Sequence, residues 1–244
     1  DTDKQDNKEK KTFTMGTSAD YPPYEFIIIN DKGEQEFVGI DISLAQALAE
    51  DMGAELKVVN MSFENLMIAL GKGEVDCVIA AMEEDEERAK VADFSDPYYT
   101  DQPPMVLVKK ENVDNYQTME DFSGKKVGAQ MSTTKADIVS NDMPGANLVA
   151  LSSVTDLVNE LMYNKCDAIV LDGAVALQYA ESNSDLVVAN VSLGEAAPYR
   201  VVVKKGDPNG LLESINKTIA ALIEDGKIEE FIEAANELSS QALE

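Results

Sequence analysis

Strand-like and helix-like segments alternate along almost the whole chain, and this alternation limits the fold more than any other feature of the sequence. Residues 63–70, for example, place Phe63, Leu66 and Leu70 at helical spacing, and an apolar run at 76–81 follows. Parallel strands need a long connection between them, which is usually a helix. The alternation therefore predicts an α/β protein with mainly parallel sheets flanked by helices.

The second half of the chain repeats the plan of the first half. ALGKGEVDCVIAA at 69–81 and ELMYNKCDAIVLD at 160–172 both run from a helix through a tight turn and an aspartate into an apolar strand. Two copies of one plan indicate two lobes of similar construction. The same patterns predict further strands at 12–17, 56–60, 125–130, 147–151 and 167–171, and further helices at 41–52 and 133–141.

Capping patterns mark several expected helix starts. Ser62 and Ser153 precede apolar helical stretches, and Asp85 precedes a short helical segment. Asp207 is followed by Pro208, a residue favoured in the first helical turn, so a helix is expected to begin there.

Two extended, proline-marked segments, 98–104 and 195–201, are the expected crossings between the lobes. Two crossings mean that the second lobe is inserted into the first, and a double connection of this kind acts as a hinge. The predicted division is a disordered polar linker at 1–11, a first lobe formed by 12–100 and 199–244, and a second lobe at 101–198.

The charge balance and the lack of histidine argue against several function classes. The chain has 20 lysines and arginines against 46 aspartates and glutamates, a formal net charge of −26, which repels nucleic-acid phosphates and anionic membranes. It has no histidine, which removes the commonest general base and the commonest zinc ligand. We therefore expect no nucleic-acid partner, no metal site, no cofactor and no catalytic relay that uses histidine.

Cys77 and Cys166 lie inside apolar runs, and we expect both to be buried free thiols. No apolar stretch approaches the roughly 20 residues that span a bilayer. The polar start DTDKQDNKEKK is either a disordered terminus or a spacer that remains after removal of an export or lipid-anchoring segment. Because residue 1 is not methionine, we expect processing or trimming.

The first lobe is expected to bring its binding groups to the end of a strand, because ligands of open α/β sheets bind beyond the carboxyl ends of the strands. The strand at 76–81 leads to Ala81, Met82 and Glu83, and the helix that follows carries Arg88. Arginine holds a carboxylate through two parallel charge-assisted hydrogen bonds.

The second lobe contributes complementary groups. Asp172 follows the strand at 167–171, and the turn at 130–134 offers free backbone N–H groups that suit an anion. Tyr21 and Phe63 supply aromatic walls. A cation, helix N-terminal amides and a carboxylate from the opposite lobe match the two ends of an α-amino acid.

Each of these residues also has a simpler explanation. Arg88 taken alone is more often a solvated surface charge, and Asp172 before Gly173 is compatible with a helix cap only. The two aromatic residues are compatible with core positions, and the acidic run at 83–88 with a solvated face. Their joint placement at predicted strand ends favours the functional interpretation.

The chain resembles the solute-binding proteins of polar amino-acid ABC transporters, which have the two-lobed type II periplasmic binding-protein fold. The resemblance covers residues 12–238 and is carried by the motifs GTSADYPPYEF, FVGIDISLA, VDCVIAAM, EERAKVADFSDPYY, STT, KCDAIVLD and YRVVVKKGDP. It implies a monomeric receptor, outside the cell or in the periplasm, that closes its lobes on a free amino acid. The receptor would then deliver the amino acid to a membrane permease.

The resemblance also implies roles for individual residues. Arg88 and Thr134 would hold the ligand α-carboxylate, and Asp172 and the Ala81 carbonyl would hold the α-ammonium. Aromatic residues would stack on the ligand side chain. The predicted ligand-binding set is Tyr21, Phe63, Ala81, Met82, Glu83, Arg88, Gln130, Ser132, Thr133, Thr134 and Asp172, and none of these residues is expected to be catalytic.

Three residues depart from the family pattern. Glu83 stands where relatives usually have Ser or Thr, and it is compatible with binding the α-ammonium, with recruiting a second cation, or with pairing with Arg88. Ser18 stands where relatives for basic amino acids often carry Asp. Asp85 replaces the usual Thr, which preserves helix capping.

The ligand expected from these residues is a basic or polar neutral amino acid. Ser18 argues against a cation pocket at the usual place, Glu83 argues against acidic ligands, and Lys135 and Gln130 leave polar neutral ligands open. Two other functions are compatible with the scaffold. One is an enzyme that resembles the cyclohexadienyl dehydratases, with Glu83 as general acid, and the other is the amino-acid sensor lobe of a receptor.

Overall fold

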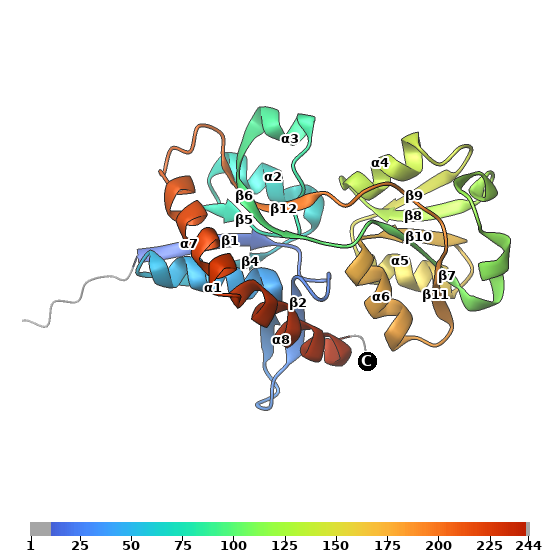
Figure 1. Cartoon of the computed structure of the whole chain (residues 1–244), viewed down its shortest axis with the longest axis horizontal. Helices are drawn as coiled ribbons and strands as arrows, with labels where there is room; N and C mark the ends of the chain where they lie inside the picture. The colour runs from blue at the N-terminus through green and yellow to red at the C-terminus, as the bar shows by residue number, and fades with distance from the viewer. Residues whose placement is uncertain (1–10, 243–244) are drawn as a thin grey trace, which may run out of the picture.

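The computed structural model describes residues 11–242 and shows two α/β lobes side by side, each built around its own five-stranded sheet (Figure 1). The expected α/β fold with two lobes is therefore confirmed. The predicted linker at 1–11 lies outside the described residues except for Lys11, which begins the first strand.

The first sheet has the strand order β4-β1-β5-β12-β6. Its members are β1 (Lys11–Thr17), β4 (Ala54–Asn60), β5 (Cys77–Val78), β6 (Ala92–Thr100) and β12 (Pro198–Lys204). β1 pairs in parallel with β4 and β5, whereas β12 runs antiparallel to both β5 and β6. Only β12 is reversed relative to the other four strands of this sheet.

The second sheet repeats this arrangement with the order β11-β7-β10-β8-β9. Its members are β7 (Met105–Lys109), β8 (Lys126–Gln130), β9 (Asn147–Leu151), β10 (Ala168–Leu171) and β11 (Leu186–Ala189). β8 pairs in parallel with β9 and β10, and only β7 is reversed, since it runs antiparallel to β10 and β11. In both sheets the reversed strand is the one that follows a crossing between the lobes.

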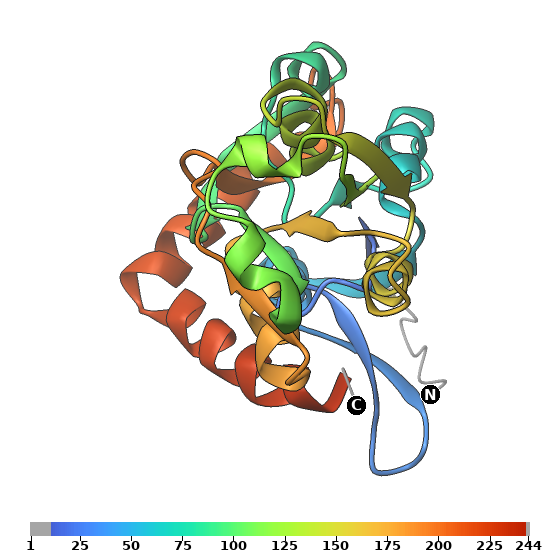
Figure 2. The ribbon, with the colours of Figure 1, turned by 90° about the vertical axis from the view of Figure 1, so that its right-hand side faces the viewer.

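Helices cover both sheets (Figures 1 and 2). The first lobe carries α1 (Ile40–Asp51), α2 (Phe63–Lys72), α3 (Glu86–Val91), α7 (Leu212–Glu224) and α8 (Lys227–Ala242), and a hairpin of β2 (Phe26–Ile29) and β3 (Gln35–Val38). The second lobe carries α4 (Thr134–Asn141), α5 (Val154–Met162), α6 (Gly173–Ser182) and two short 3-10 helices, η1 (Lys110–Asn115) and η2 (Met119–Phe122).

The chain passes between the two sheets twice. β6 ends at Thr100 and β7 begins at Met105, and later β11 ends at Ala189 and β12 begins at Pro198. The first passage contains Pro103 and Pro104, and the second leads directly into Pro198, the first residue of β12. The lobe limits at residues 100 and 199 stay predictions.

Most element boundaries match the predicted ones within about two residues, and the exceptions have local causes. The strand predicted at 76–81 forms ladder pairs only at 77–78, because Ala81 has a φ of +43° and its N–H donates to the Asp41 carboxylate. Ser153 and Asp85 do accept backbone N–H groups at the starts of α5 and α3.

Two capping predictions were wrong in detail. Ser62 occupies the N-cap position of α2, but its hydroxyl accepts from the Asn65 side-chain amide at 2.7 Å instead of from the backbone. The helix expected at Asp207-Pro208 begins only at Leu212, because Asp207 adopts a φ of +42°. Its carboxylate still accepts the N–H groups of Leu211 and Leu212 at 2.8 and 3.0 Å.

Cys77 and Cys166 are buried free thiols, as expected, and burial raises the pKa of both thiols. Within residues 11–242, no helix combines the length and apolar character that a membrane crossing requires. The same residues contain no group of three or more metal-ligating acidic, cysteine or histidine side chains arranged to hold an ion.

The first crossing packs against the start of α6 at Gly173. A Cβ atom on Gly173 would lie 2.7 Å from the Gln102 Cβ and 2.7 Å from the Pro103 carbonyl oxygen. Glycine is therefore required here by close backbone approach. This contact holds the crossing against the residue that follows Asp172.

We expect Gly173→Ala to lower the free energy of unfolding by about 1–3 kcal/mol, because the added methyl group has no room beside backbone atoms. Gly71→Ala is the matched control, since a Cβ at that helical position meets no atom within 4 Å. The control should be neutral or more stable by up to about 1 kcal/mol. Urea denaturation of both variants gives the comparison, and equal stability of Gly173→Ala and the unchanged protein would contradict the packing argument.

Candidate functional site

A cavity of about 20 Å³ lies between the two lobes, where the carboxyl ends of β5, β8 and β10 meet. Most of the predicted binding residues line it: Tyr21, Phe63, Ala81, Glu83, Arg88, Gln130, Thr133, Thr134 and Asp172. Glu25, Ala80 and Lys135 also line it, although they were not in the predicted set. Residues far apart in the sequence thus share one enclosed site.

Arg88 is held in the site by protein acceptors and an aromatic ring. Its Nε lies 3.1 Å from Asp85, its Nη1 donates to the Glu83 carbonyl at 2.7 Å, and its Nη2 donates across the cleft to the Ser132 carbonyl at 2.8 Å. The guanidinium carbon lies 5.6 Å from the centre of the Phe63 ring, a cation–π geometry. Burial lowers the pKa of Arg88, although neighbouring acidic groups oppose that shift.

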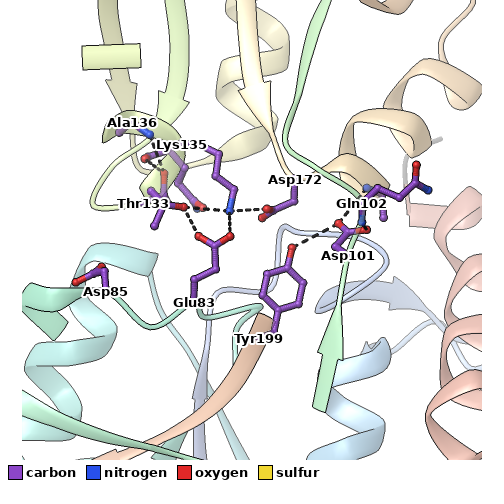
Figure 3. Close-up of polar contacts among 12 residues, drawn as sticks. Glu83, Asp85, Asp101, Gln102, Thr133, Lys135, Ala136, Asp172 and Tyr199 are labelled. Atoms are coloured by element: carbon purple, nitrogen blue, oxygen red, sulfur yellow. Dashed lines mark hydrogen bonds and ion pairs between the residues drawn. The ribbon is translucent and has the colours of Figure 1, made fainter. Parts of the chain in front are cut away.

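The carboxylate of Glu83 pairs with Lys135 and not with Arg88. Its Oε1 lies 3.1 Å from the Lys135 Nζ, and its Oε2 accepts the Thr134 hydroxyl. Lys135 makes a second ion pair with Asp172, so its ammonium stands between carboxylates from the two lobes (Figure 3). Of the roles that the sequence left open for Glu83, the side-chain pairing with Arg88 is therefore not present in this structure.

Lys135 is a buried cation with only 6% of its surface exposed. Burial alone would lower the pKa of Lys135, but the charges of Asp172 and Glu83 outweigh burial and raise it. The ammonium therefore stays protonated in the cleft.

Tyr21 links the first lobe to the second. Its hydroxyl donates to Asp172 Oδ2 at 2.6 Å and accepts the Asp172 backbone N–H at 3.1 Å. Burial, followed by the Asp172 charge, raises the pKa of Tyr21 well above its usual range. Asp172 is at the N-cap position of α6, but its side chain makes no capping hydrogen bond, so the helix-cap explanation does not account for it.

Most polar groups of the turn before α4 form hydrogen bonds within the turn or with the neighbouring backbone. The Thr133 hydroxyl donates to the Gln130 carbonyl at 2.7 Å and accepts the Ala136 N–H, and the Gln130 side chain donates to the Ser152 carbonyl at 2.9 Å. Ser132 has a φ of +62°, a conformation that costs a serine energy, and turns its carbonyl toward Arg88.

Two predicted residues do not line the cavity. Met82 is fully buried and packs in a hydrophobic cluster with Leu66 and Leu70, while its carbonyl accepts the Arg200 N–H. The Ser132 residue is exposed. We propose that these two residues act through their backbone carbonyls, as supports for neighbouring side chains.

Asp41 positions the end of β5. Its carboxylate accepts the Ala81 N–H at 2.7 Å and the Tyr98 hydroxyl at 2.7 Å, and it is fully buried. Burial raises the pKa of Asp41 to about 6, although hydrogen bonds from Ala81, Tyr98 and Glu25 lower it. Asp41 thereby fixes the backbone of Ala81 at the cavity wall.

Glu25 is the residue that sequence reasoning missed most completely. It is 1% exposed, lines the cavity, and its Oε2 has no hydrogen-bond partner. Burial, followed by the Asp41 charge and a hydrogen bond to the Asp41 side chain, raises the pKa of Glu25 well above its usual range and so favours the protonated carboxyl group. A glutamate inside the apolar motif YPPYEF was the available signal.

Comparison with known proteins identifies the family. The family model described as "Bacterial extracellular solute-binding proteins, family 3" matches residues 13–234. This match covers most of the chain. The chain belongs to that family.

Individual relatives agree with this assignment. The binding protein is 34% identical over 225 residues to "Arginine-binding extracellular protein ArtP" of Bacillus subtilis, covering 90% of this chain and 84% of that protein. Among solved structures, the amino-acid ABC transporter substrate-binding protein AbpA of Streptococcus pneumoniae bound to L-arginine has 33% identity and a TM-score of 0.89, with 94% and 96% of the two chains covered.

A third similar protein is bound to a different amino acid. An ancestral arginine-binding protein bound to glutamine is 35% identical, with a TM-score of 0.83 and coverage of 92% of this chain and 97% of that chain. These similar proteins are solute-binding proteins, and this binding protein is likewise not an enzyme.

The two lobes of the binding protein touch directly, so the structure is a closed one. Besides the contacts of Arg88, Lys135 and Tyr21, the Asp20 carboxylate accepts the Val154 N–H at the start of α5, at 2.8 Å. The Ser152 hydroxyl donates to Glu64 at 2.6 Å. Polar contacts thus surround the cavity on several sides.

The buried Asp41 should make stability depend on pH. A carboxyl group with a raised native pKa binds more protons in the folded than in the unfolded protein, so its contribution to the free energy of unfolding falls as pH rises from about 4 to about 6. A shift of roughly two units corresponds to about 3 kcal/mol.

Asp41→Asn removes this ionisation and should flatten that part of the pH profile measured by urea denaturation. Asp31→Asn, in the exposed turn of the β2–β3 hairpin, is the control and should leave the profile unchanged. A profile for Asp41→Asn that parallels the unchanged protein between pH 4 and pH 6 would count against this account.

Proposed function

We propose that this protein captures a free basic amino acid, with L-arginine first, between its two lobes and presents the closed form to the membrane permease of an ABC transporter. The observation that carries the ligand class is the buried Glu25 carboxyl oxygen, which lines the cavity without a hydrogen-bond partner. A carboxyl group in that position suits a cationic side chain, because a buried cation needs a counter-charge and this group supplies one when it loses its proton. The arginine complexes of similar proteins support the same ligand.

The main-chain end of the ligand has matching groups in the same cavity. A guanidinium carries five N–H donors, and Arg88 uses three hydrogen-bond or ion-pair contacts to protein acceptors. The remaining donors suit the α-carboxylate. Asp172 and the Ala81 carbonyl suit the α-ammonium, and Phe63 and Tyr21 form apolar walls for the side chain.

Relatives for basic amino acids often carry an aspartate where this chain has Ser18. Glu25 offers a carboxyl group for a cation at a different place in the cavity. The Ser18 hydroxyl points to Asp20 at 3.4 Å, and Asp20 is engaged with the start of α5. A basic ligand is therefore compatible with the loss of the family aspartate at position 18. A polar neutral ligand such as glutamine remains the second candidate, because a similar protein binds it.

The place of action is part of the proposal. Members of the family are extracellular solute-binding proteins, and we propose that this one works as a monomer held to the outer face of the membrane by a lipid anchor. The polar, mixed-charge residues DTDKQDNKEKK suit a spacer between a membrane surface and a folded lobe. Partition of the protein made by its native host into detergent phase, and its recovery in the aqueous phase after lipase treatment, would test the anchor.

Replacing Arg88 tests the carboxylate site. Arg88→Ala should weaken L-arginine binding by about 2–5 kcal/mol, measured by isothermal titration calorimetry, because a buried charge pair is broken. Lys90→Ala on the same helix is the control, since Lys90 is an exposed residue paired only with Glu87 among the described contacts. Unchanged affinity in Arg88→Ala would refute the assignment.

Replacing Glu25 tests the side-chain site. Binding of a cation beside Glu25 lowers its raised pKa, so the unchanged protein should release up to one proton when L-arginine binds near neutral pH. Calorimetry in buffers with different ionisation enthalpies measures this release. Glu25→Gln should abolish the release and weaken L-arginine binding by at least about 1.4 kcal/mol, roughly tenfold.

Two comparisons keep this test specific. Binding of L-glutamine should release no proton, and Glu36→Gln on the exposed β2–β3 hairpin should behave like the unchanged protein. Equal proton release with both amino acids would exclude Glu25 as the partner of the ligand side chain.

A further inference from the structure

The carboxylate oxygens that face the cavity from Glu83 and Asp172 are already occupied by groups of this chain. The two oxygens of Glu83 meet the Lys135 ammonium and the Thr134 hydroxyl, and those of Asp172 meet the same ammonium and the Tyr21 hydroxyl. A carboxylate oxygen can accept more than one hydrogen bond, but the Lys135 ammonium stands between the two carboxylates. An additional cation at this place therefore competes with that ammonium.

The α-ammonium of an amino acid would replace the Lys135 ammonium at the two carboxylates. The Lys135 side chain ends in an ammonium, the same chemical group as the α-ammonium of an amino acid, and it is bound between the same two carboxylates (Figure 3). The cavity of about 20 Å³ has room for little more than one water molecule beside it. The lysine and a ligand ammonium thus compete for Asp172 and Glu83.

When a ligand ammonium displaces Lys135 from a carboxylate, the buried lysine loses an anionic partner, and only some ligands replace it. The side chain is almost fully buried, and an ammonium that loses Asp172 keeps only Glu83 of its two anionic partners, so a further anion inside the cleft would stabilise it. Its Nζ lies 3.2 Å from the Thr134 hydroxyl, in the first turn of α4, where helix N–H groups favour negative charge. A ligand carboxylate bound at this turn would meet the displaced ammonium.

We propose that Lys135 is a specificity-determining residue that makes the site select ligands carrying both an α-ammonium and an α-carboxylate. This inference rests on the proposed function, because it assigns a discriminating role within the same amino-acid site. The ammonium of a zwitterion takes a protein carboxylate away from Lys135, and the carboxylate of the same zwitterion replaces it. An amine without a carboxylate takes Asp172 or Glu83 and leaves the buried lysine with one anionic partner in place of two.

The negative charge of Glu83 balances the positive charge of Lys135 in the cleft. Glu83 adds one negative charge to the cleft and Lys135 adds one positive charge, so the pair leaves the net charge of the site unchanged. Arg88 and Lys135 then face a carboxylate, and Asp172 and Glu83 face an ammonium. Each end of the ligand thus faces two groups of opposite charge. Arg88 keeps Asp85 as its ion-pair partner whatever the ligand, so the loss of the ligand carboxylate affects Lys135 most.

The test compares L-arginine with agmatine, which is arginine without its carboxylate. The unchanged protein should prefer L-arginine. Lys135→Met should strengthen agmatine binding at least tenfold while changing L-arginine binding less, because agmatine then takes no carboxylate away from a buried ammonium. The ratio of the two affinities, measured by calorimetry, should fall at least tenfold. Lys135→Arg keeps the charge and should keep the ratio within about threefold.

Two results would overturn the proposal. One is an unchanged affinity ratio in Lys135→Met, and the other is a loss of affinity for both compounds by the same factor, which a purely structural role would produce. The double variant Glu83→Gln with Lys135→Met removes both charges together and guards against a folding defect from a lone buried charge. Its affinity ratio should match that of Lys135→Met.

A second measurement separates this proposal from the proposed function. Urea denaturation of the protein without added amino acid, for the two single variants and the double variant, gives the coupling between positions 83 and 135. We expect the unfolding equilibrium constants to deviate from additivity by at least tenfold. Additive effects would overturn the pairing even if L-arginine binds. Failure of the unchanged protein to bind L-arginine would instead overturn the proposed function and the selectivity with it.

Discussion

The pairing of charges that are buried between two lobes is the constraint on which the rest of this structure depends. Lys135 and Asp172 come from one lobe and Glu83 and Arg88 from the other, and all four are nearly inaccessible to solvent. An unpaired buried charge costs several kcal/mol, so the lobes can approach only where each cation meets an acceptor. The geometry of the site and the energy of closure are therefore set by the same few atoms.

The fold brings these atoms together by simple means. The strands that lead to Glu83, Asp172 and the turn at 130–134 all point their carboxyl ends into the cleft. The two reversed strands, β7 and β12, lie inside their sheets and not at the edges, so each crossing is anchored in a core. The segments that join the sheets, 101–104 and 190–197, lie outside these cores (Figure 1).

Local patterns predicted much of the fold, and the failures came from contacts between distant residues. α1 and β9 follow from apolar periodicity alone and were predicted within one residue. β5 was predicted too long, because the Ala81 N–H bonds to Asp41 of another element and leaves the ladder. The late start of α7 depends on a positive φ at Asp207, which a cap followed by proline does not reveal.

In the candidate site, too, local motifs predicted some residues, and contacts between distant residues explain the ones that were missed. Motifs at strand ends placed Arg88, Asp172 and the turn before α4 in one cleft, and the structure brings them together. Lys135 was noted only as a neighbour of the turn, since its partners come from other segments of the chain. Glu25 was missed because its importance comes from burial and from an unpartnered oxygen, and neither can be read from an apolar motif.

Tyrosines gather where the crossings leave the first sheet. The Tyr24 ring stands edge-on to Tyr199 with centroids 5.1 Å apart, Tyr98 and Tyr99 lie nearby, and the Tyr199 hydroxyl reaches Asp101, whose carboxylate accepts the Ala174 N–H of the other lobe. The chain contains eight tyrosines and no tryptophan. Its near-ultraviolet absorption and its emission therefore come mainly from tyrosine. A change in the angle between the lobes would alter the surroundings of several of these rings, so tyrosine emission would report that change without an added label.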